Sequence, residues 1–395
     1  MKTNIAVFFG CRSVEHEVSI ISAVQAMRAI DTDKYDVTPV YVTKDGAMYN
    51  SDKMFDIESF KNIAELVSES EEVTFVKKSD GVFMHAVNKK PFKKQRDIRI
   101  DLAFPIVHGT NCEDGTMAGY LEFLGLPYIG CDILSAAVGM DKAVFKDVLK
   151  SAGLPTLDCI RFTSREYMLD SAKISEEIEK IGFPLIVKPV NLGSSVGISK
   201  VKDISALDEA IRLAASFTDK ILVERAVENL REINCSVLGD ADECVASVCE
   251  EPFMHDEILS YKDKYEGGKS GEASKGMASL GRKIPADISD ELSHKIQDIS
   301  CKIFKAIGAS GVVRIDYLLD GKTGAIFANE INTIPGSLAF YLWEATGLKY
   351  RDMINKLIDT AFKRERKRSN LKFTIDTNIL SGVSFGSKGS KGSKF

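Results

Sequence analysis

Near its C-terminal end the sequence reads Val312-Val-Arg-Ile-Asp-Tyr-Leu-Leu319, then Asp320-Gly-Lys-Thr-Gly324, then Ala325-Ile-Phe-Ala-Asn-Glu-Ile-Asn332. Two apolar runs flank a short segment of turn residues, which predicts a β-hairpin. Arg314 and Asp316 are two residues apart, and so are Glu330 and Asn332, so each pair lies on one face of its strand. The hairpin is therefore expected to bring an arginine, two carboxylates and an amide to one side of a sheet.

These four side chains suit phosphoryl transfer. Asp316, Glu330 and Asn332 offer the oxygen ligands that Mg²⁺ takes when it is bound together with phosphate oxygens. Arg314 can stabilise negative charge on a phosphoryl group in transfer. The competing interpretation is an exposed polar face, but the rest of the hairpin is rich in Val, Ile, Leu and Phe. The pattern favours a metal and nucleotide site.

A second phosphate-binding element lies upstream. The apolar run Leu185-Ile-Val-Lys188 predicts a strand, and the loop Gly193-Ser-Ser-Val-Gly197 follows it. Such a loop presents backbone N–H groups and hydroxyls to an anion, and Lys188 and Lys142 can each add a positive charge. The loop also matches the GxSxG motif of hydrolases, which requires a helix directly after it. Residues 198–201 predict a strand instead, which disfavours a hydrolase.

The segment after the next predicted strand suits the rest of a nucleotide. Glu224-Arg-Ala-Val227 follows the apolar residues 221–223 and could form a hinge whose backbone reads an adenine edge. Glu232 is then available for the ribose hydroxyls. No P-loop, dinucleotide fingerprint or HExxH motif occurs in the chain.

The order of predicted elements divides the chain. Strands at 5–9, 37–42 and 102–107 alternate with helices at 17–30 and 115–124, which predicts an α/β domain with a parallel sheet and a ligand at its carboxyl edge. Residues 51–100 are polar and are interpreted as a variable insertion. From Met140 onward the elements predict an α+β layout. Its helices are expected at 141–152, 206–215, 289–307 and 350–364, and its strands at 185–188, 198–201, 221–224, 233–238, 312–319 and 325–332.

Composition excludes several classes of protein. The 395 residues include 52 Lys and Arg against 57 Asp and Glu, so the net charge of −5 gives no overall basic field for nucleic acid. No apolar run approaches the ~20 residues of a membrane span, and Ile5–Phe9 is shorter than a signal-peptide core, so we expect a cytoplasmic protein without membrane contact. Eight cysteines without a CxxC pair predict free thiols.

The C-terminal residues have a different character. Lys363–Arg368 carries five positive charges and one negative charge. Such cations suit a helix C-terminus, and the alternative is a nucleic-acid or lipid contact. The sequence Gly-Ser-Lys, repeated three times from Gly386, is expected to be mobile.

Taken in order, these motifs resemble the D-alanine–D-alanine ligases of the ATP-grasp superfamily, from Ile5 to about Thr360. The matching stretches are Phe9-Gly-Cys-Arg-Ser-Val-Glu-His-Glu-Val-Ser19, Val107-His-Gly-Thr-Asn-Cys-Glu-Asp-Gly-Thr116, Met140-Asp-Lys142, Ile186-Val-Lys-Pro189, Gly193–Gly197, Asp263-Lys-Tyr265 with Pro285-Ala286, Gly311–Asp316 and Glu330-Ile-Asn-Thr-Ile-Pro-Gly336. The resemblance implies an ATP-grasp fold behind an N-terminal parallel βαβ domain. We expect boundaries at 1–139 for the first domain, 140–362 for the ATP-grasp domain (halves 140–226 and 227–362), and 363–395 for a tail.

The resemblance also implies an activity and roles for individual residues. The activity is ATP-dependent joining of two D-alanines through a D-alanyl phosphate, for peptidoglycan precursors. Glu15, linked to Ser194 and Tyr265, would bind the amino group of the first D-alanine, with His108 beside it. Arg314 and the N–H of Gly336 would stabilise the reacting groups. ATP would be held by Lys142, Lys188, Ser195, Glu224, Val227, Glu232 and Lys264, and two Mg²⁺ or Mn²⁺ ions by Asp316, Glu330 and Asn332.

The chain departs from the family pattern after Gly336. The family usually has hydroxyl residues there for the carboxylate of the second substrate, whereas this chain has Ser337-Leu-Ala-Phe-Tyr-Leu-Trp343. By alignment Tyr341 and Leu342 occupy the specificity positions. The alternatives are therefore a D-alanine–D-serine or other D-alanyl ligase, and a nucleotide-binding relative without ligase activity. The family implies a homodimer.

Overall fold

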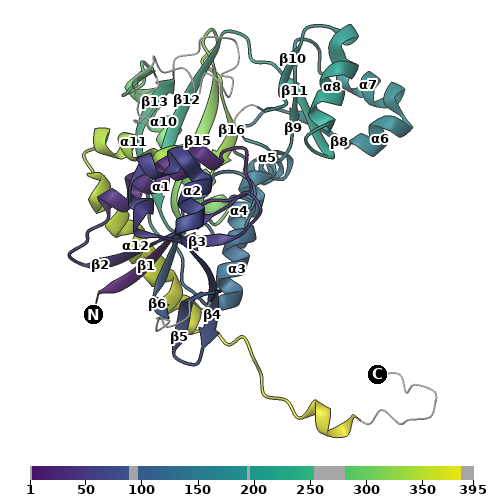
Figure 1. Ribbon diagram of the computed structural model, residues 1–395. Helices are drawn as coiled ribbons and strands as arrows, with labels where there is room; N and C mark the ends of the chain where they lie inside the picture. The colour runs from purple at the N-terminus through teal and green to yellow at the C-terminus, as the bar shows by residue number, and fades with distance from the viewer. Residues whose placement is uncertain (1, 89–96, 194–195, 253–280, 384–395) are drawn as a thin grey trace, which may run out of the picture.

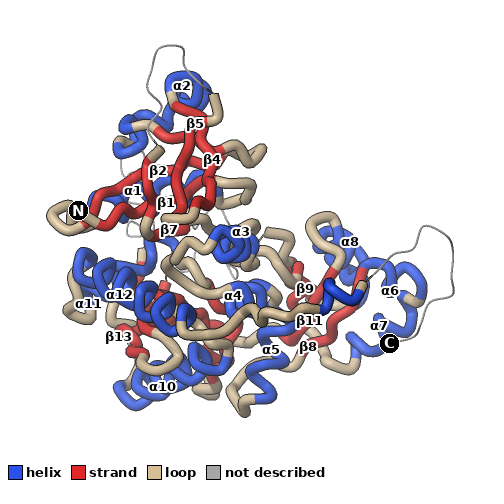
Figure 2. The backbone as a smooth tube through the Cα atoms, turned by 90° about the horizontal axis from the view of Figure 1, so that it is seen from below, coloured by secondary structure: helices blue, strands red, loops and turns tan. Residues whose placement is uncertain are grey.

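The computed structural model describes residues 2–88, 97–193, 196–252 and 281–383. Ser194, Ser195, Lys264 and Tyr265, four of the expected site residues, lie outside the described residues, as do the Gly-Ser-Lys repeats. The described strands form three separate sheets (Figures 1 and 2). The described residues confirm an α/β domain followed by α+β units.

The N-terminal sheet has seven strands in the order β6-β5-β4-β3-β2-β1-β7. They are β1 (Thr3–Gly10), β2 (Tyr35–Val42), β3 (Met48–Asn50), β4 (Glu71–Lys78), β5 (Gly81–Ala86), β6 (Ile98–Ile100) and β7 (Leu102–Pro105). β1 pairs in parallel with both β2 and β7, as expected. The remaining pairs, from β2 to β6, are antiparallel, so the sheet is mixed and not wholly parallel.

Residues 51–100, which the sequence suggested to be a polar insertion, form regular elements that extend the N-terminal sheet. Three helical turns, η1 (Asp52–Phe55), η2 (Ile57–Asn62) and α2 (Ile63–Glu69), lead into β4. In β4 only Val73 and Phe75 are buried, and charged residues occupy both ends of the strand. One face of a short antiparallel strand contacts solvent, so the segment is polar overall although it is regular.

Four helices accompany this sheet and the start of the next unit: α1 (His16–Ala29), α3 (Thr116–Leu124), α4 (Ile133–Met140) and α5 (Lys142–Ser151). β1 ends at Gly10, which has a φ of 90°; a Cβ there would lie 2.4 Å from the Val42 carbonyl oxygen. Only glycine avoids this clash, and the turn that follows brings Glu15 to the start of α1. The carboxyl edge of the sheet thereby presents the first predicted site residue.

A small lobe contains the four antiparallel strands β8 (Cys159–Thr163), β9 (Leu185–Pro189), β10 (Ser199–Val201) and β11 (Lys220–Arg225), in the order β10-β9-β11-β8. Its helices are α6 (Ser164–Leu169), α7 (Ser171–Glu179), η3 (Ile204–Ala206) and α8 (Leu207–Ala215). The Gly193–Gly197 loop is followed by strand β10, so it lacks the helix that a hydrolase elbow requires.

The third sheet carries the predicted hairpin. Its order is β14-β13-β12-β15-β16, with β12 (Leu230–Gly239), β13 (Cys244–Pro252), β14 (Arg282–Lys283), β15 (Gly311–Asp320) and β16 (Ile326–Asn332). Its helical elements, with those of the C-terminal end, are α10 (Asp290–Ala306), η5 (Gly336–Ala339), α11 (Phe340–Ala345), α12 (Tyr350–Ser369) and η6 (Ile379–Gly382). All eight cysteines are free thiols, as expected.

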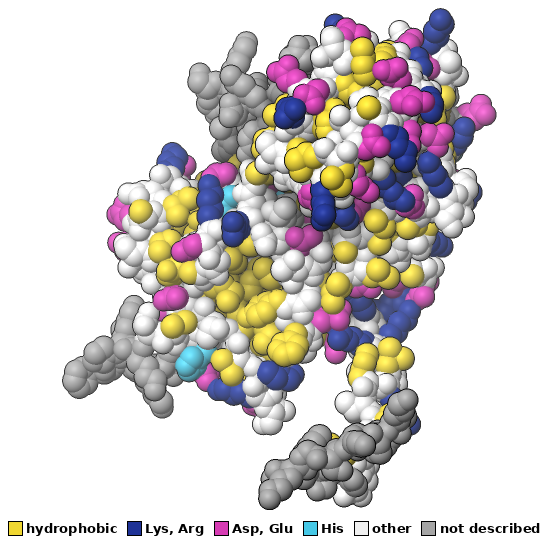
Figure 3. Space-filling view, turned by 90° about the vertical axis from the view of Figure 1, so that its right-hand side faces the viewer, with side chains coloured by type: hydrophobic (Ala, Val, Ile, Leu, Met, Phe, Trp, Pro, Cys, Tyr) yellow, Lys and Arg dark blue, Asp and Glu magenta, His cyan; other side chains and the backbone are white. Residues whose placement is uncertain are grey.

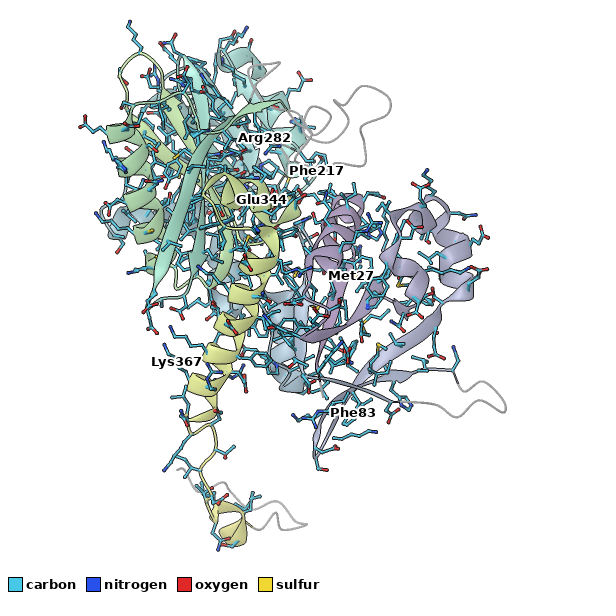
Figure 4. All side chains as sticks on the ribbon, turned by 90° about the vertical axis from the view of Figure 1, so that its left-hand side faces the viewer. Met27, Phe83, Phe217, Arg282, Glu344 and Lys367 are labelled. Carbon is cyan, nitrogen blue, oxygen red and sulfur yellow. The ribbon has the colours of Figure 1, made fainter. Side chains whose placement is uncertain are left out.

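Helix α12 joins the C-terminal unit to the N-terminal domain (Figure 4, in which Lys367 marks its distal part). One buried cluster contains residues of β1, α1, α12 and Trp343, so the two units share a core. Arg364 donates hydrogen bonds to the carbonyl oxygens of Gly130 and Tyr128. The basic residues predicted at the end of this helix therefore dock it against the protein.

Candidate active site

A cavity of about 440 Å³ lies between the small lobe and the third sheet. This volume is within the range typical of small-molecule sites. Its walls include six of the residues that the sequence assigned to a nucleotide and its metals: Lys188, Glu224, Val227, Glu232, Asp316 and Glu330. These residues come from β9, β11, the segment after β11, β12 and the β15–β16 hairpin, so folding brings together the separate motifs.

The predicted hairpin forms, with a shift of register between Asp316 and Tyr317. Arg314 is the Cα partner of Asn332, and Asp316 is the partner of Glu330. The Arg314 guanidinium donates to both carboxylate oxygens of Asp316, at 2.6 and 2.7 Å. Burial acts to lower the pKa of Arg314, but the charge of Asp316 prevails and raises it well above its ordinary value. Arg314 is therefore a permanent cation beside the cavity.

The donor set fits Mg²⁺ in chemistry: two carboxylates and one amide, on adjacent strands. Among the described residues no group of three or more His, Cys, Asp or Glu forms a ready metal cage. Such a site suits Mg²⁺, which is usually held by one or two carboxylates together with substrate phosphates. Asn332 Nδ2 donates to Asp316 Oδ2 at 3.0 Å, so its Oδ1 is the atom suited to ligate a cation.

A second, smaller cavity joins the N-terminal domain to the hairpin. Its lining includes Glu15, Lys142, Gly193 and Asn332, and Glu330 lines both this cavity and the larger one. A Cβ at Gly193 would lie 3.3 Å from Glu15 Oε2, so the glycine allows the loop to approach this carboxylate. The early glutamate, the Gly/Ser loop and the hairpin thus meet at one place.

Lys142 connects the loop to the hairpin. It begins α5, where the Asp141 side chain accepts hydrogen bonds from the first turn. Its Nζ donates to the Leu192 carbonyl oxygen at 2.7 Å and lies 3.2 Å from Glu330 Oε2. The ammonium group is therefore held where the phosphates of a nucleotide and the predicted metal ligands would meet.

Lys188 belongs to a buried charge group that the sequence revealed only in part. Its Nζ lies 2.6 Å from Glu224 Oε1 and 2.9 Å from Asn329 Oδ1. The other Glu224 oxygen, Oε2, lies 2.8 Å from Nζ of Lys146, a residue to which the sequence analysis gave no role. Burial acts to raise the pKa of Glu224, but the charges of Lys188 and Lys146 lower it to about 2.

His108 contacts the turn that carries Gly336. Its Nδ1 lies 2.7 Å from the Ile334 carbonyl oxygen, which can only accept, so Nδ1 carries the proton. Nε2 then accepts from the Ser22 hydroxyl at 2.8 Å, and Ser22 Oγ in turn accepts from the N–H of Ser337 at 2.9 Å. Burial lowers the pKa of His108, which agrees with a neutral ring. Both ring nitrogens are thus engaged by the protein.

Glu113 holds the other side of the same turn and was not predicted. Its Oε1 accepts from the Ile334 N–H at 2.8 Å, and its Oε2 accepts from the Gly109 N–H at 2.7 Å. Burial and the charge of Glu15 raise the pKa of Glu113 to about 8, although the backbone donors act in the opposite direction. Glu113 and His108 therefore fix the two backbone groups of Ile334.

The segment after Gly336 is unusual in its backbone. Ser337, Leu338 and Ala339 have φ values of 50°, 53° and 51°, a left-handed conformation in which non-glycine residues are uncommon. Strained residues of this kind cluster at functional sites. Tyr341 donates its hydroxyl to Glu250 at 3.0 Å.

Nine of the described predicted residues line one or both of the two cavities, which share Glu330. His108, Arg314 and Gly336 do not line either cavity. Tyr341 and Leu342 do not line them either and pack in a hydrophobic cluster with Ala339, where Leu342 is fully buried. Arg282 stacks over the Tyr341 ring, with the Cζ atom 4.2 Å from the ring centroid. Lys146 could have been noted in the sequence, because it lies four residues after Lys142 on the same helical face.

Comparisons with known proteins match nearly the whole chain. The family model described as D-ala D-ala ligase N-terminus matches residues 4–131, and the model described as D-ala D-ala ligase C-terminus matches residues 148–359. A D-alanine–D-alanine ligase of Thermosipho melanesiensis is 38% identical over 383 residues, covering 95% of this chain and 98% of the relative. One of Acetivibrio thermocellus is 38% identical over 388 residues, covering 94% and 98%.

Solved structures agree with these matches. The D-alanine–D-alanine ligase of Coxiella burnetii has a TM-score of 0.77 and 28% identity, covering 93% of this chain and 96% of that chain. The VanG D-Ala:D-Ser ligase of Enterococcus faecalis has a TM-score of 0.76 and 31% identity, covering 91% and 100%. The fold is accordingly an ATP-grasp arrangement behind an α/β domain, and the chain belongs to the D-alanine–D-alanine ligase family.

Proposed function

We propose that this protein is an ATP-dependent ligase that joins two D-alanines to D-alanyl-D-alanine, for peptidoglycan precursors. The observation that carries this proposal is that Glu330 lines both cavities. A nucleotide in the larger cavity would direct its phosphates toward the smaller one, where Glu15 and Lys142 lie. The curated relatives named D-alanine–D-alanine ligase support the same substrates.

The first step transfers the γ-phosphoryl group of ATP to the carboxylate of one D-alanine, which gives D-alanyl phosphate and ADP. Lys142 and Lys188 would hold the phosphates, and Arg314 would stabilise the charge on the transferred group. Asp316, Glu330 and Asn332 would hold Mg²⁺ or Mn²⁺. Such ions reduce the repulsion between ATP and an attacking carboxylate.

The second step is attack of the neutral amine of another D-alanine on the acyl carbon, after which phosphate leaves. Glu15, nearly buried at the start of α1, is suited to bind the ammonium group of the first D-alanine. The Gly336 N–H would stabilise the oxyanion, and His108 with Glu113 would keep its turn in place. Two sets of roles remain predictions from the family: those of Ser194, Ser195, Lys264 and Tyr265, and the contacts of Glu224, Val227 and Glu232 with adenosine.

The identity of the second substrate depends on the segment after Gly336. D-alanine is favoured, because eight relatives of 34–38% identity are all named D-alanine–D-alanine ligase. The roles of Tyr341 and Leu342 in selecting it remain a prediction. Competition between D-alanine and D-serine for incorporation into the product distinguishes the two ligase activities.

We also propose the domain boundaries and the assembly. Boundaries near 139 and 226 agree with the ends of α4 and β11, whereas α12 continues beyond 362 to Ser369. Phe123 and Leu134, on α3 and α4, are 92% and 69% exposed and would suit the expected homodimer.

On the face shown in Figure 3, basic side chains are interspersed with acidic ones. Among the described residues, each helix is too short or too polar to cross a bilayer. A cytoplasmic location remains a prediction.

The test is ADP release with each D-amino acid alone and in pairs, followed by mass analysis of the product. The proposal predicts ADP release with D-alanine and a product of the mass of D-alanyl-D-alanine. ATP binding without turnover on any D-amino acid would support the alternative of a nucleotide-binding relative. Turnover only with D-alanine together with D-serine would support the other ligase activity.

A further inference from the structure

Lys146 is a charged residue that contacts the nucleotide site without lining its cavity. Its side chain is only 1% exposed, and Nζ lies 2.8 Å from Glu224 Oε2. Nζ also donates to Thr156 Oγ1 at 3.2 Å, and the Thr156 hydroxyl donates to the Ala328 carbonyl oxygen at 3.1 Å. The ammonium group is therefore held from two sides: by Glu224 on β11 of the small lobe, and by Thr156, which is bonded to β16 of the third sheet.

A side chain that only filled this space would not need a charge. Burial of an ammonium group is costly unless the group is paired and hydrogen-bonded. Phe145 and Leu149, its neighbours on α5, are apolar and fully buried in the core that they share with the third sheet. The charge of Lys146 therefore needs an explanation beyond packing, and its contact with Glu224 supplies one.

The two oxygens of Glu224 are divided between two lysines. Oε1 lies 2.6 Å from Lys188 Nζ, at the cavity wall, and Oε2 lies 2.8 Å from Lys146 Nζ, behind it. Two cations share one anion, so this group carries one positive charge in excess. Without Lys146, Glu224 would neutralise Lys188 completely, and this wall of the cavity would lose its excess positive charge.

We propose that Lys146 is a positioning residue of the nucleotide site, which shares Glu224 with Lys188 and thereby leaves one net positive charge at the phosphate-binding wall. This inference rests on the proposed function, because it assumes that the cavity holds ATP. It assigns Lys146 no contact with substrate. Its effect on the nucleotide is therefore electrostatic and passes through Glu224.

Four proteins test the proposal by their charge at the triad: wild type (+1), Lys146→Met (0), Glu224→Gln (+2) and the double variant (+1). The measured quantity is a ratio of two association constants from calorimetry of the full chain. The first is that of a non-hydrolysable β,γ-imido ATP analogue with Mg²⁺, and the second is that of adenosine. A shift of Glu224 could also change the affinity for the adenine base. Dividing by the association constant of adenosine removes that effect from the comparison. Thermal unfolding identifies variants that do not fold.

The ratio should fall by about tenfold to a hundredfold in Lys146→Met, as expected for one charge at a partly desolvated site. It should recover to within a few-fold of wild type in the double variant, and Glu224→Gln should have the highest ratio. If Lys146→Met does not fold, the comparison of Glu224→Gln with the double variant isolates Lys146. Equal ratios in that pair, or in wild type and Lys146→Met, would overturn the proposal while the proposed function stands. Failure of the wild type to bind the ATP analogue would overturn both.

Discussion

The burial of Glu113 predicts how the stability of the fold depends on pH, because the surroundings of this side chain disfavour its charged form. In the folded protein its pKa is raised from 4.5 to about 8 by burial and by the charge of Glu15. A raised carboxyl pKa means that the native state holds a proton that the unfolded state has released at neutral pH. The stability that this group contributes is therefore complete below pH 4.5 and is lost as the pH rises toward 8.

The magnitude follows from proton linkage. Where the native state binds one more proton than the unfolded state, stability falls by about 1.4 kcal/mol per pH unit. Glu113→Gln removes this titration and keeps the size of the side chain. From pH 5.5 to 7.5 the wild type should therefore lose about 2.5 kcal/mol of unfolding free energy relative to Glu113→Gln, slightly less than the full slope because the native group begins to ionise near pH 7.5.

The assay is urea unfolding of both proteins at several pH values between 5.5 and 8. Glu344→Gln, at an exposed carboxyl labelled in Figure 4, is the matched control, and its difference from the wild type should change little with pH. The three donors at Glu113, from Gly109, Ile334 and Thr333, favour the carboxylate. If these donors prevail, the difference in unfolding free energy between wild type and Glu113→Gln will not depend on pH, and that result would contradict a raised pKa at Glu113.

Three further substitutions test separate parts of the structure. Asp316→Ala should abolish D-alanine-dependent ADP release, and it should lower the free energy of unfolding by about 3–5 kcal/mol because it leaves the Arg314 guanidinium without its partner. Glu15→Gln should raise the KM for D-alanine by about tenfold or more, through loss of a charge-assisted contact, with the KM for ATP unchanged in steady-state kinetics. An unchanged KM for D-alanine would contradict the amine-binding role. Arg364→Met should lower the free energy of unfolding by about 1–3 kcal/mol, because two carbonyl oxygens lose their donors. A denaturation midpoint equal to that of the wild type would show that this contact does not fix α12.

Local periodicity was enough to predict the β15–β16 hairpin and which of its polar side chains share a face. The spacing of two between Arg314 and Asp316 fixes which side chains share a face, whatever the rest of the chain does. The N-terminal β1 and α1 were predicted for the same reason. By contrast, β4 and β5 escaped, because their alternation is short and charged residues surround it.

The contacts between distant segments could not be predicted from periodicity. Glu15 lies more than 300 positions before Glu330, and only the resemblance to a family placed them in one site. Glu113 belongs to a recognised motif, but its hydrogen bond to Ile334 spans 221 positions. Lys146 was missed because a lysine on an amphipathic helix is usually solvated, and nothing local shows that Glu224 lies opposite.

In the proposed mechanism, a carboxylate oxygen of D-alanine attacks the phosphoryl group of ATP before the peptide bond forms. This step can be tested with D-alanine labelled with ¹⁸O in both carboxylate oxygens, by mass spectrometry of the phosphate released. Because phosphate leaves the acyl carbon with the bridging oxygen, one ¹⁸O atom is expected in each phosphate. Formation of D-alanyl-D-alanine with unlabelled phosphate would contradict it.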